Sequence, residues 1–220
     1  MINFRTDLAL ERRDLFKKAN NISNEVDGLE TQEESFTDDI KISRVKVLND
    51  NGEQAIGKRK GTYITIDIKN LKIAGEDEIQ KASEAVTKEL KNLIGALVDP
   101  QEDILVVGLG NLYVTPDALG PKVVNEIDIT RHLLNYMPDV LDKDTRPVSA
   151  IAPGVLGTTG IETLEVIKGI VENIHPKLII VIDALASRSI ERISSTVQLA
   201  DTGIVPGAGV GNERKELTKE

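Results

Sequence analysis

Two short apolar runs, both rich in β-branched residues, constrain the fold of this chain most. They are Ile104–Val107 and Leu178–Ile182. Neither run alternates with polar residues, which predicts strands that are buried on both faces of a parallel sheet. Segments with helical spacing of apolar residues, Glu76–Leu97 and Ile161–Ile174, lie between and before them. This rhythm predicts an α/β fold with a mostly parallel sheet flanked by helices.

The first third of the chain has a different pattern. Ile40–Val47 and Tyr63–Ile68 alternate with period two, which predicts strands, and Asp50–Gly52 is typical of a turn. We therefore expect a small antiparallel β element at about residues 40–70, ahead of the main sheet. The acidic stretch Glu30–Asp39 is expected to be solvated or mobile. The basic run Gly57–Gly61 is expected to be a solvated hairpin loop.

Further along the chain, local signals predict one helix, one break and one more strand-like segment. The stripe expected to be buried on the helix over Glu76–Leu97 comprises Ile79, Ala82, Ala85, Leu90, Leu93 and Leu97. Thr115 is expected to cap a short helix with Pro116 at its first position. Gly120-Pro121 should disrupt that helix and favour a shaped loop. Val148–Ala152 is a third apolar segment.

Composition excludes several classes of function. The 220 residues are 40% hydrophobic and 29% charged, which suits one globular domain with an appendage. Aromatic residues make up 3% and the net charge is −9, so nucleic-acid binding is disfavoured. The absence of cysteine excludes disulfides, thiolate nucleophiles and cysteine-ligated zinc. No apolar stretch approaches the ~18 residues of a membrane span, and no signal core opens the chain, so we expect a cytoplasmic protein.

Two aspartates occupy nearly the same local sequence. Asp117 precedes Ala118-Leu119, and Asp183 precedes Ala184-Leu185 at the end of a predicted strand. Chemistry in open α/β sheets gathers beyond the carboxyl ends of the strands. The two carboxylates are therefore candidates for one acid/base site that activates water. The alternatives are that Asp117 only favours a helix dipole and that Asp183 only caps a helix over residues 184–190.

Other motifs carry weaker signals. Gly108-Leu109-Gly110-Asn111 follows a strand, but the dinucleotide fingerprint requires a third glycine where Tyr113 stands. The glycine-dense segment 207–211 lacks a strand-to-helix context and is expected to be a loop. Asp201-Thr202-Gly203 matches a tripeptide of aspartic proteases, yet those proteases are all-β, so a turn is the favoured interpretation. His132 and His175 lack metal-ligand spacing.

Several of these motifs, taken together and in order, resemble one known family, the germination protease of spore-forming bacteria. The segments that carry the resemblance are residues 5–11, 106–111, 114–121, 153–155, 159–163, 182–192 and 206–212.

The resemblance implies an endopeptidase that begins the degradation of small acid-soluble spore proteins during germination, in the forespore or spore core. It implies an α/β fold similar to that of hydrogenase-maturation proteases, a homotetramer, and no cofactor or metal. It also implies a zymogen that cleaves itself between Asp7 and Leu8, so that residues 1–7 are a prosegment and residues 8–220 a single peptidase domain. The family's two essential aspartates fall on Asp117 and Asp183.

Two further expectations concern the end of the chain and the walls of the cleft. The chain ends before the family's usual length, so a C-terminal part of the family's protein is expected to be missing. Four residues, Gly108, Gly110, Asn111 and Gly154, are expected to form backbone walls of the cleft and to donate N–H groups to an oxyanion. The alternative function is a non-catalytic module whose glycine loops bind a nucleotide or an anion.

Overall fold

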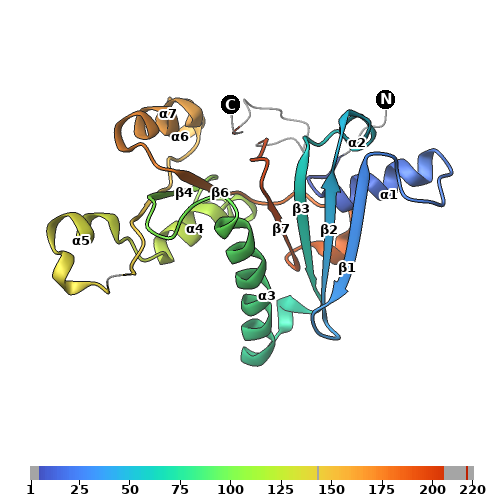
Figure 1. The fold of residues 1–220 in the computed structure, drawn as a ribbon, viewed down its shortest axis with the longest axis horizontal. Coiled ribbons are helices and arrows are strands. Elements are labelled where there is room, and N and C mark those ends of the chain that lie inside the picture. Colours follow the sequence, from blue (N-terminus) through green and yellow to red (C-terminus); the bar gives the residue numbers. More distant parts are fainter. Residues whose placement is uncertain (1–4, 143, 206–216, 218–220) are drawn as a thin grey trace. The chain divides into compact units, whose positions relative to one another are not determined.

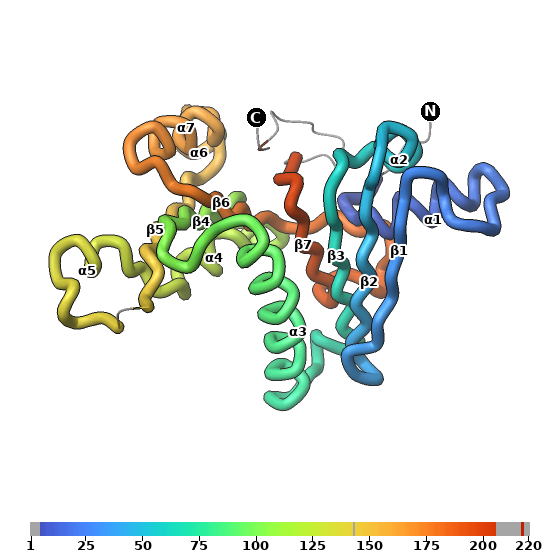
Figure 2. The backbone as a smooth tube through the Cα atoms, viewed as in Figure 1, coloured from blue at the N-terminus to red at the C-terminus, as the bar shows by residue number. Residues whose placement is uncertain are grey.

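The computed structural model describes residues 5–142, 144–205 and 217, and it divides the chain into two compact units (Figure 1). The first unit comprises Met1–Leu93 and Leu185–Glu220, and the second comprises Ile94–Ala184. Each unit contains its own sheet, and the chain leaves the first unit after one long helix and later returns to it (Figure 2). Among the described residues, no helix combines the length and the apolar character that crossing a membrane requires.

The first unit contains a four-stranded antiparallel sheet. Its strands, in spatial order, are β1 (Leu29–Ser35), β2 (Ile40–Val47), β3 (Gly61–Ile68) and β7 (Thr196–Ala200). The predicted strands over 40–47 and 63–68 are confirmed. The sheet is larger than predicted because β7 pairs with β3 from a distant part of the sequence, with Gln198 opposite Thr65.

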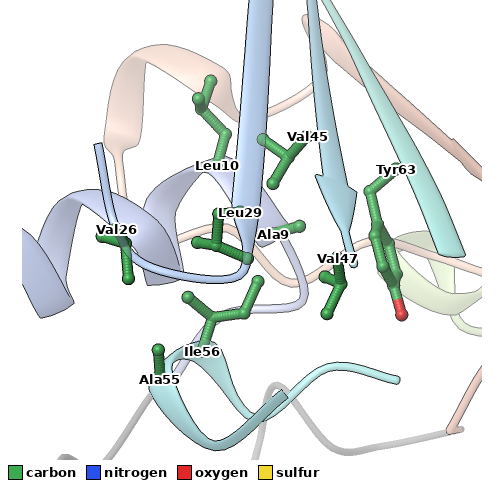
Figure 3. Packing of buried hydrophobic residues seen from close by; sticks show 9 residues of the cluster. All are labelled: Ala9, Leu10, Val26, Leu29, Val45, Val47, Ala55, Ile56 and Tyr63. Carbon is green, nitrogen blue, oxygen red and sulfur yellow. The ribbon is translucent and has the colours of Figure 1, made fainter. Parts of the chain in front are cut away.

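Helices cover both faces of this sheet. Strand side chains alternate between the faces, so the even-numbered isoleucines of β2 and β3 face α3 (Glu76–Gly95), where they pack with Ala82 and Ala85. The opposite face packs against α1 (Ala9–Ala19) and α2 (Asp50–Ile56). Figure 3 shows this second core, which comprises Ala9, Leu10, Val26, Leu29, Val45, Val47, Ala55, Ile56 and Tyr63.

Three local predictions in this unit are wrong. Asp50–Gly52 begins helix α2 instead of forming a turn, because the Asn49 side chain accepts a hydrogen bond from the Gly52 N–H and caps the helix. Since α2 separates β2 from β3, Gly57–Gly61 is not a hairpin loop. Most of the acidic stretch Glu30–Asp39 is exposed as expected, but its first part is strand β1, paired along its length with β2.

Helix α3 confirms the predicted helix and corrects its stripe. Ala82 and Ala85 are buried as expected, whereas Ile79 is 53% exposed and Leu97 lies beyond the helix. The most buried charged residue of the helix is Glu89, 2% exposed, whose Oε1 lies 2.6 Å from Nη2 of Arg44. A partner on the sheet makes burial of this carboxylate tolerable, and local sequence carries no signal of that partner.

The second unit contains a three-stranded parallel sheet, as predicted. Its elements are β4 (Ile104–Gly108), η2 (Thr115–Asp117), α4 (Leu119–Glu126), α5 (Arg131–Tyr136), η3 (Pro138–Val140), β5 (Val148–Ile151), α6 (Leu156–Thr159), α7 (Thr163–Ile174) and β6 (Leu178–Ile182). The strand order is β5-β4-β6, so the chain crosses between parallel neighbours through its helices. All five residues of β4 are buried, as expected for a central strand.

The segment after β4 differs from the prediction. Thr115 begins the short helix η2 rather than capping it, and Gly120-Pro121 lie inside the first turn of helix α4. Proline is tolerated there because the first N–H groups of a helix have no intrahelical acceptor.

Candidate active site

The candidate site is built at the carboxyl ends of the two neighbouring strands β4 and β6. Gly108, the last residue of β4, pairs with Ile182, the last residue of β6, and the Leu109 N–H donates to the Ile182 carbonyl at 2.8 Å. Asp183 follows Ile182 directly. This register fixes the start of the Asp183 segment against the start of the loop that leaves β4.

Asp117 lies in that loop and closes it. Its Oδ2 accepts a hydrogen bond from the Asn111 N–H at 2.9 Å, and its carbonyl oxygen lies 3.1 Å from the same nitrogen. The Asn111 side chain in turn accepts from the Tyr113 N–H at 3.0 Å. The Asp117 carboxylate is thereby bound to backbone three residues beyond the end of β4.

Two glycines allow the backbone to come this close. Gly110 has φ of +115°, and a Cβ built on it would lie 2.0 Å from the Asp117 carbonyl oxygen. A Cβ on Gly120 would lie 2.3 Å from the Leu109 carbonyl oxygen and 2.6 Å from that of Ile182. Real Cβ atoms do not make such approaches, so both positions require glycine. Gly120 thus brings the start of α4 against the ends of both strands.

Asp183 lies in a loop. Its Oδ1 accepts from the Ala184 N–H at 2.8 Å, and no helix begins before η4 (Ile190–Arg192). The alternative in which Asp183 caps a helix over residues 184–190 is therefore wrong. Both aspartates lie at the same edge of the parallel sheet, each with a carboxylate oxygen bound to a backbone N–H.

The four residues expected to form cleft walls occupy this edge as well. Gly154, with φ of +76°, follows β5, the other neighbour of β4, and its carbonyl accepts from Thr163 Oγ1 at 3.3 Å. The Asn111 N–H is already donated to Asp117, so in this structure it is not available to an oxyanion. The glycines after β4 serve close backbone packing, which removes the main support for a phosphate-binding loop.

The predicted processing site, Asp7–Leu8, belongs to the first unit. Thr6 and Leu8 are fully buried, and the Asp7 N–H donates to the Ala186 carbonyl at 2.8 Å. The Asp7 carboxylate accepts from the Ala186 N–H at 3.0 Å. Residues 1–4 of the expected prosegment lie outside the described residues.

The remaining candidates have local structural roles. Asp201 Oδ1 accepts from the Thr62 N–H at 2.8 Å, so it fixes the turn after β7 against β3. His132 lies on α5, and His175 ends α7 in the left-handed conformation. Across residues 5–142 and 144–205, no three histidine or carboxylate side chains gather as they would around a metal ion. The glycine-dense segment 207–211 lies outside the described residues.

Sequence reasoning missed a carboxylate hub in the first unit. Glu11, 7% exposed, lies in the first turn of α1. Its carboxylate accepts hydrogen bonds from Thr6 Oγ1, Ser187 Oγ, the Arg188 N–H, the Ser189 N–H and Arg192 Nη1. Burial alone would raise the pKa of Glu11, but the hydrogen bonds outweigh it and lower the pKa below its ordinary value. Four of the five partners are about 180 residues away, so no local signal could reveal the hub.

Lys58 was also missed, because the basic run around it has the composition of a solvated loop. The side chain is half-buried, and its Nζ lies 5.8 Å from the centre of the Tyr63 ring. Desolvation and repulsion from Arg12 lower its pKa to about 8, against an opposing attraction to Asp7.

Comparison with known proteins points to one family. The family model for germination protease matches residues 7–220. The germination protease of Clostridium perfringens is 49% identical over 220 residues, which are 100% of this chain and 66% of that protein. The Clostridium acetobutylicum protein is 49% identical, and the match covers 100% of this chain and 67% of that protein. The Caldanaerobacter subterraneus protein is 50% identical, and the match covers 100% of this chain and 65% of that protein. The chain thus spans about two thirds of the length of the curated relatives it matches.

Proposed function

Because the chain belongs to the germination protease family, we propose that it is an endopeptidase that begins the degradation of small acid-soluble spore proteins during germination. The single observation that carries the proposal beyond family membership is the placement of Asp117 and Asp183. They follow neighbouring parallel strands at the same sheet edge, where α/β enzymes build their active sites.

In the proposed mechanism the two carboxylates share the proton transfers of peptide hydrolysis. One carboxylate takes a proton from a water molecule, whose oxygen attacks the peptide carbonyl carbon. The other, protonated, gives its proton to the nitrogen of the leaving amide as the C–N bond breaks.

Substrate would lie across the strand ends as an extended peptide. Gly108, Gly110 and Gly154 lie at this edge of the sheet, beside the two aspartates. The Asn111 N–H has a different proposed role: it orients the Asp117 carboxylate.

We further propose that the chain is made as a zymogen cleaved between Asp7 and Leu8, that the whole protein forms a homotetramer, and that it acts in the spore core. Family membership supports these three statements. The alternative of a nucleotide- or anion-binding module is not favoured, because the glycines after β4 pack against backbone and because the Asn111 N–H is already donated to Asp117.

The test is mass spectrometry of a purified small acid-soluble spore protein after incubation with the chain, and with its Asp117→Asn and Asp183→Asn variants. We expect discrete cleavage by the unaltered chain and a loss of about 1,000-fold or more in each variant. Circular dichroism would establish that the variants are folded. Cleavage by Asp183→Asn at the normal rate would rule out the carboxylate mechanism.

A further inference from the structure

The peptide bond between Asp7 and Leu8 is bracketed by one side chain. Gln198 Nε2 donates to the Asp7 carbonyl at 3.1 Å, and Gln198 Oε1 accepts from the Ala9 N–H at 2.9 Å. The N–H of Leu8 donates to Thr6 Oγ1 at 3.2 Å. Both backbone polar groups of this peptide unit therefore have protein partners, and the Leu8 side chain has no exposed surface.

Sheet register explains why Gln198 stands at this position. On β7 it lies opposite Thr65 of β3, which in turn lies opposite Ser43 of β2. Thr65 and Ser43 are buried, and the Thr65 hydroxyl has no hydrogen-bond partner. Without the amide of Gln198, the Asp7 carbonyl and the Ala9 N–H would be left without their partners over this sheet face, which is costly.

Glu11 binds the same segment through Thr6. It accepts from Thr6 Oγ1 at 2.5 Å and joins that residue to Arg192, whose guanidinium also binds Asp67 of β3 at 3.1 Å. The Thr6 carbonyl accepts from Arg12 Nε at 2.9 Å. The N-terminal segment is thereby bound to α1, to the loop at Ala186–Arg192 and to β7, all within the first unit.

We propose that Gln198 and Glu11 lock the Asp7–Leu8 bond inside the fold, so that residues 5–8 must unfold locally before any protease can cut it. A protease needs its substrate segment extended and free of other partners, and a buried bond is cut only from an open state. The lock rests on the proposed function only for the identity of the protease that makes the cut. In this proposal Gln198 and Glu11 are positioning residues, because they keep the Asp7–Leu8 bond folded and out of reach of a protease.

The test uses an external protease, so that it does not depend on the chain's own activity. Thermolysin cleaves on the amino side of leucine, and the full chain would carry Asp183→Asn to prevent self-cleavage. We expect the Asp7–Leu8 bond to be cut at least about 100-fold more slowly in the folded chain than in a synthetic peptide of residues 1–14. Similar rates in the chain and the peptide would overturn the proposal.

Variants then identify the lock residues. Gln198→Met and Glu11→Gln should each accelerate release of residues 1–7 about tenfold, since each removes hydrogen bonds from the segment. Gln80→Met, an exposed position on α3, is the matched control and should leave the rate unchanged. Cleavage at Asn21–Ile22, after α1, serves as an internal reference for the integrity of the fold.

Each outcome is decisive. Faster release of residues 1–7 with an unchanged rate at Asn21–Ile22 supports the lock. Equal acceleration at both bonds means that the variant loosens the whole unit. In that case the comparison of the chain that carries only Asp183→Asn with the peptide of residues 1–14 decides whether the fold protects the Asp7–Leu8 bond. Unchanged release in both variants removes Gln198 and Glu11 from the proposal.

Discussion

Gly120 lies so close to Ile182 that a Cβ on the glycine would meet the carbonyl oxygen of Ile182 at 2.6 Å. That carbonyl also accepts the Leu109 N–H, and Asp183 follows it directly. A single glycine therefore sets how closely the start of helix α4, and with it the Asp117 loop, approaches the end of β6.

Gly120→Ala is expected to destabilise the protein by about 2–4 kcal/mol, because the new Cβ would meet backbone atoms of Leu109 and Ile182, which cannot yield as a flexible side chain would. Urea unfolding measures the effect. Gly169→Ala, in open space on α7, is the matched control and should stabilise by about 1 kcal/mol, since alanine favours a helix. Equal effects of the two variants would contradict the packing role of Gly120.

The buried pair of Arg44 and Glu89 gives a second prediction. Arg44→Met should cost about 3–5 kcal/mol of unfolding free energy, because it leaves the Glu89 carboxylate, 2% exposed, without a cation. Lys41→Met breaks the exposed pair with Glu33 and should cost less than about 1 kcal/mol. The double variant Arg44→Met, Glu89→Met should recover much of the loss; a purely additive double variant would argue against coupling.

Replacement of Lys58 should give a gain in stability that depends on pH. Its pKa falls from its ordinary 10.5 to about 8 on folding, so at pH 7 the protein holds a charge that the fold disfavours. Lys58→Met should raise the melting temperature at pH 7. The unfolded chain binds more protons than the folded one between about pH 8 and 10.5, so the advantage of the variant should shrink across that window. An advantage that stays constant with pH would show that packing is its cause.

Glu11, unlike Lys58, stabilises the folded protein, and its contribution also depends on pH. Its pKa is lowered in the folded protein, so its contribution is present above its ordinary pKa of 4.5 and is lost as pH falls through the folded value. Glu11→Gln should therefore cost most stability near neutral pH and progressively less in acid. Melting curves of the two proteins from neutral to acid pH measure the difference, and parallel curves would show that the charge of Glu11 has no role.

A substitution at Asp201 tests whether this residue has a role in a turn or in the active site. Asp201→Ala should cost about 1 kcal/mol of stability, since it removes the acceptor for the Thr62 N–H, and should leave proteolysis unchanged. Asp117→Asn should leave stability unchanged and remove proteolysis. Assays of both variants on the same spore protein would make the comparison, and loss of cleavage in Asp201→Ala would return that residue to the candidate site.

Strong local patterns were sufficient for much of the secondary structure. The uniform apolar runs at Ile104–Val107 and Leu178–Ile182 identified the parallel strands, and alternation identified β2 and β3. Where tertiary partners override local preference, prediction was wrong. The acidic stretch at Glu30–Asp39 begins as a strand because its backbone pairs with β2, where Lys41 and Arg44 also bind two of its glutamates.

The sequence by itself determined the α/β class, the strands that end beside Asp117 and Asp183, and, through its motifs, the family. Periodicity and strand composition are local properties, so they can be recognised in the sequence alone. Only the tertiary structure decided that β7 joins the antiparallel sheet, that Gly120 packs against the end of β6, and that Gln198 and Glu11 enclose the Asp7–Leu8 bond. Hydrogen bonds between residues about 180 positions apart depend on which surfaces of the folded chain meet, and local sequence patterns do not predict those contacts.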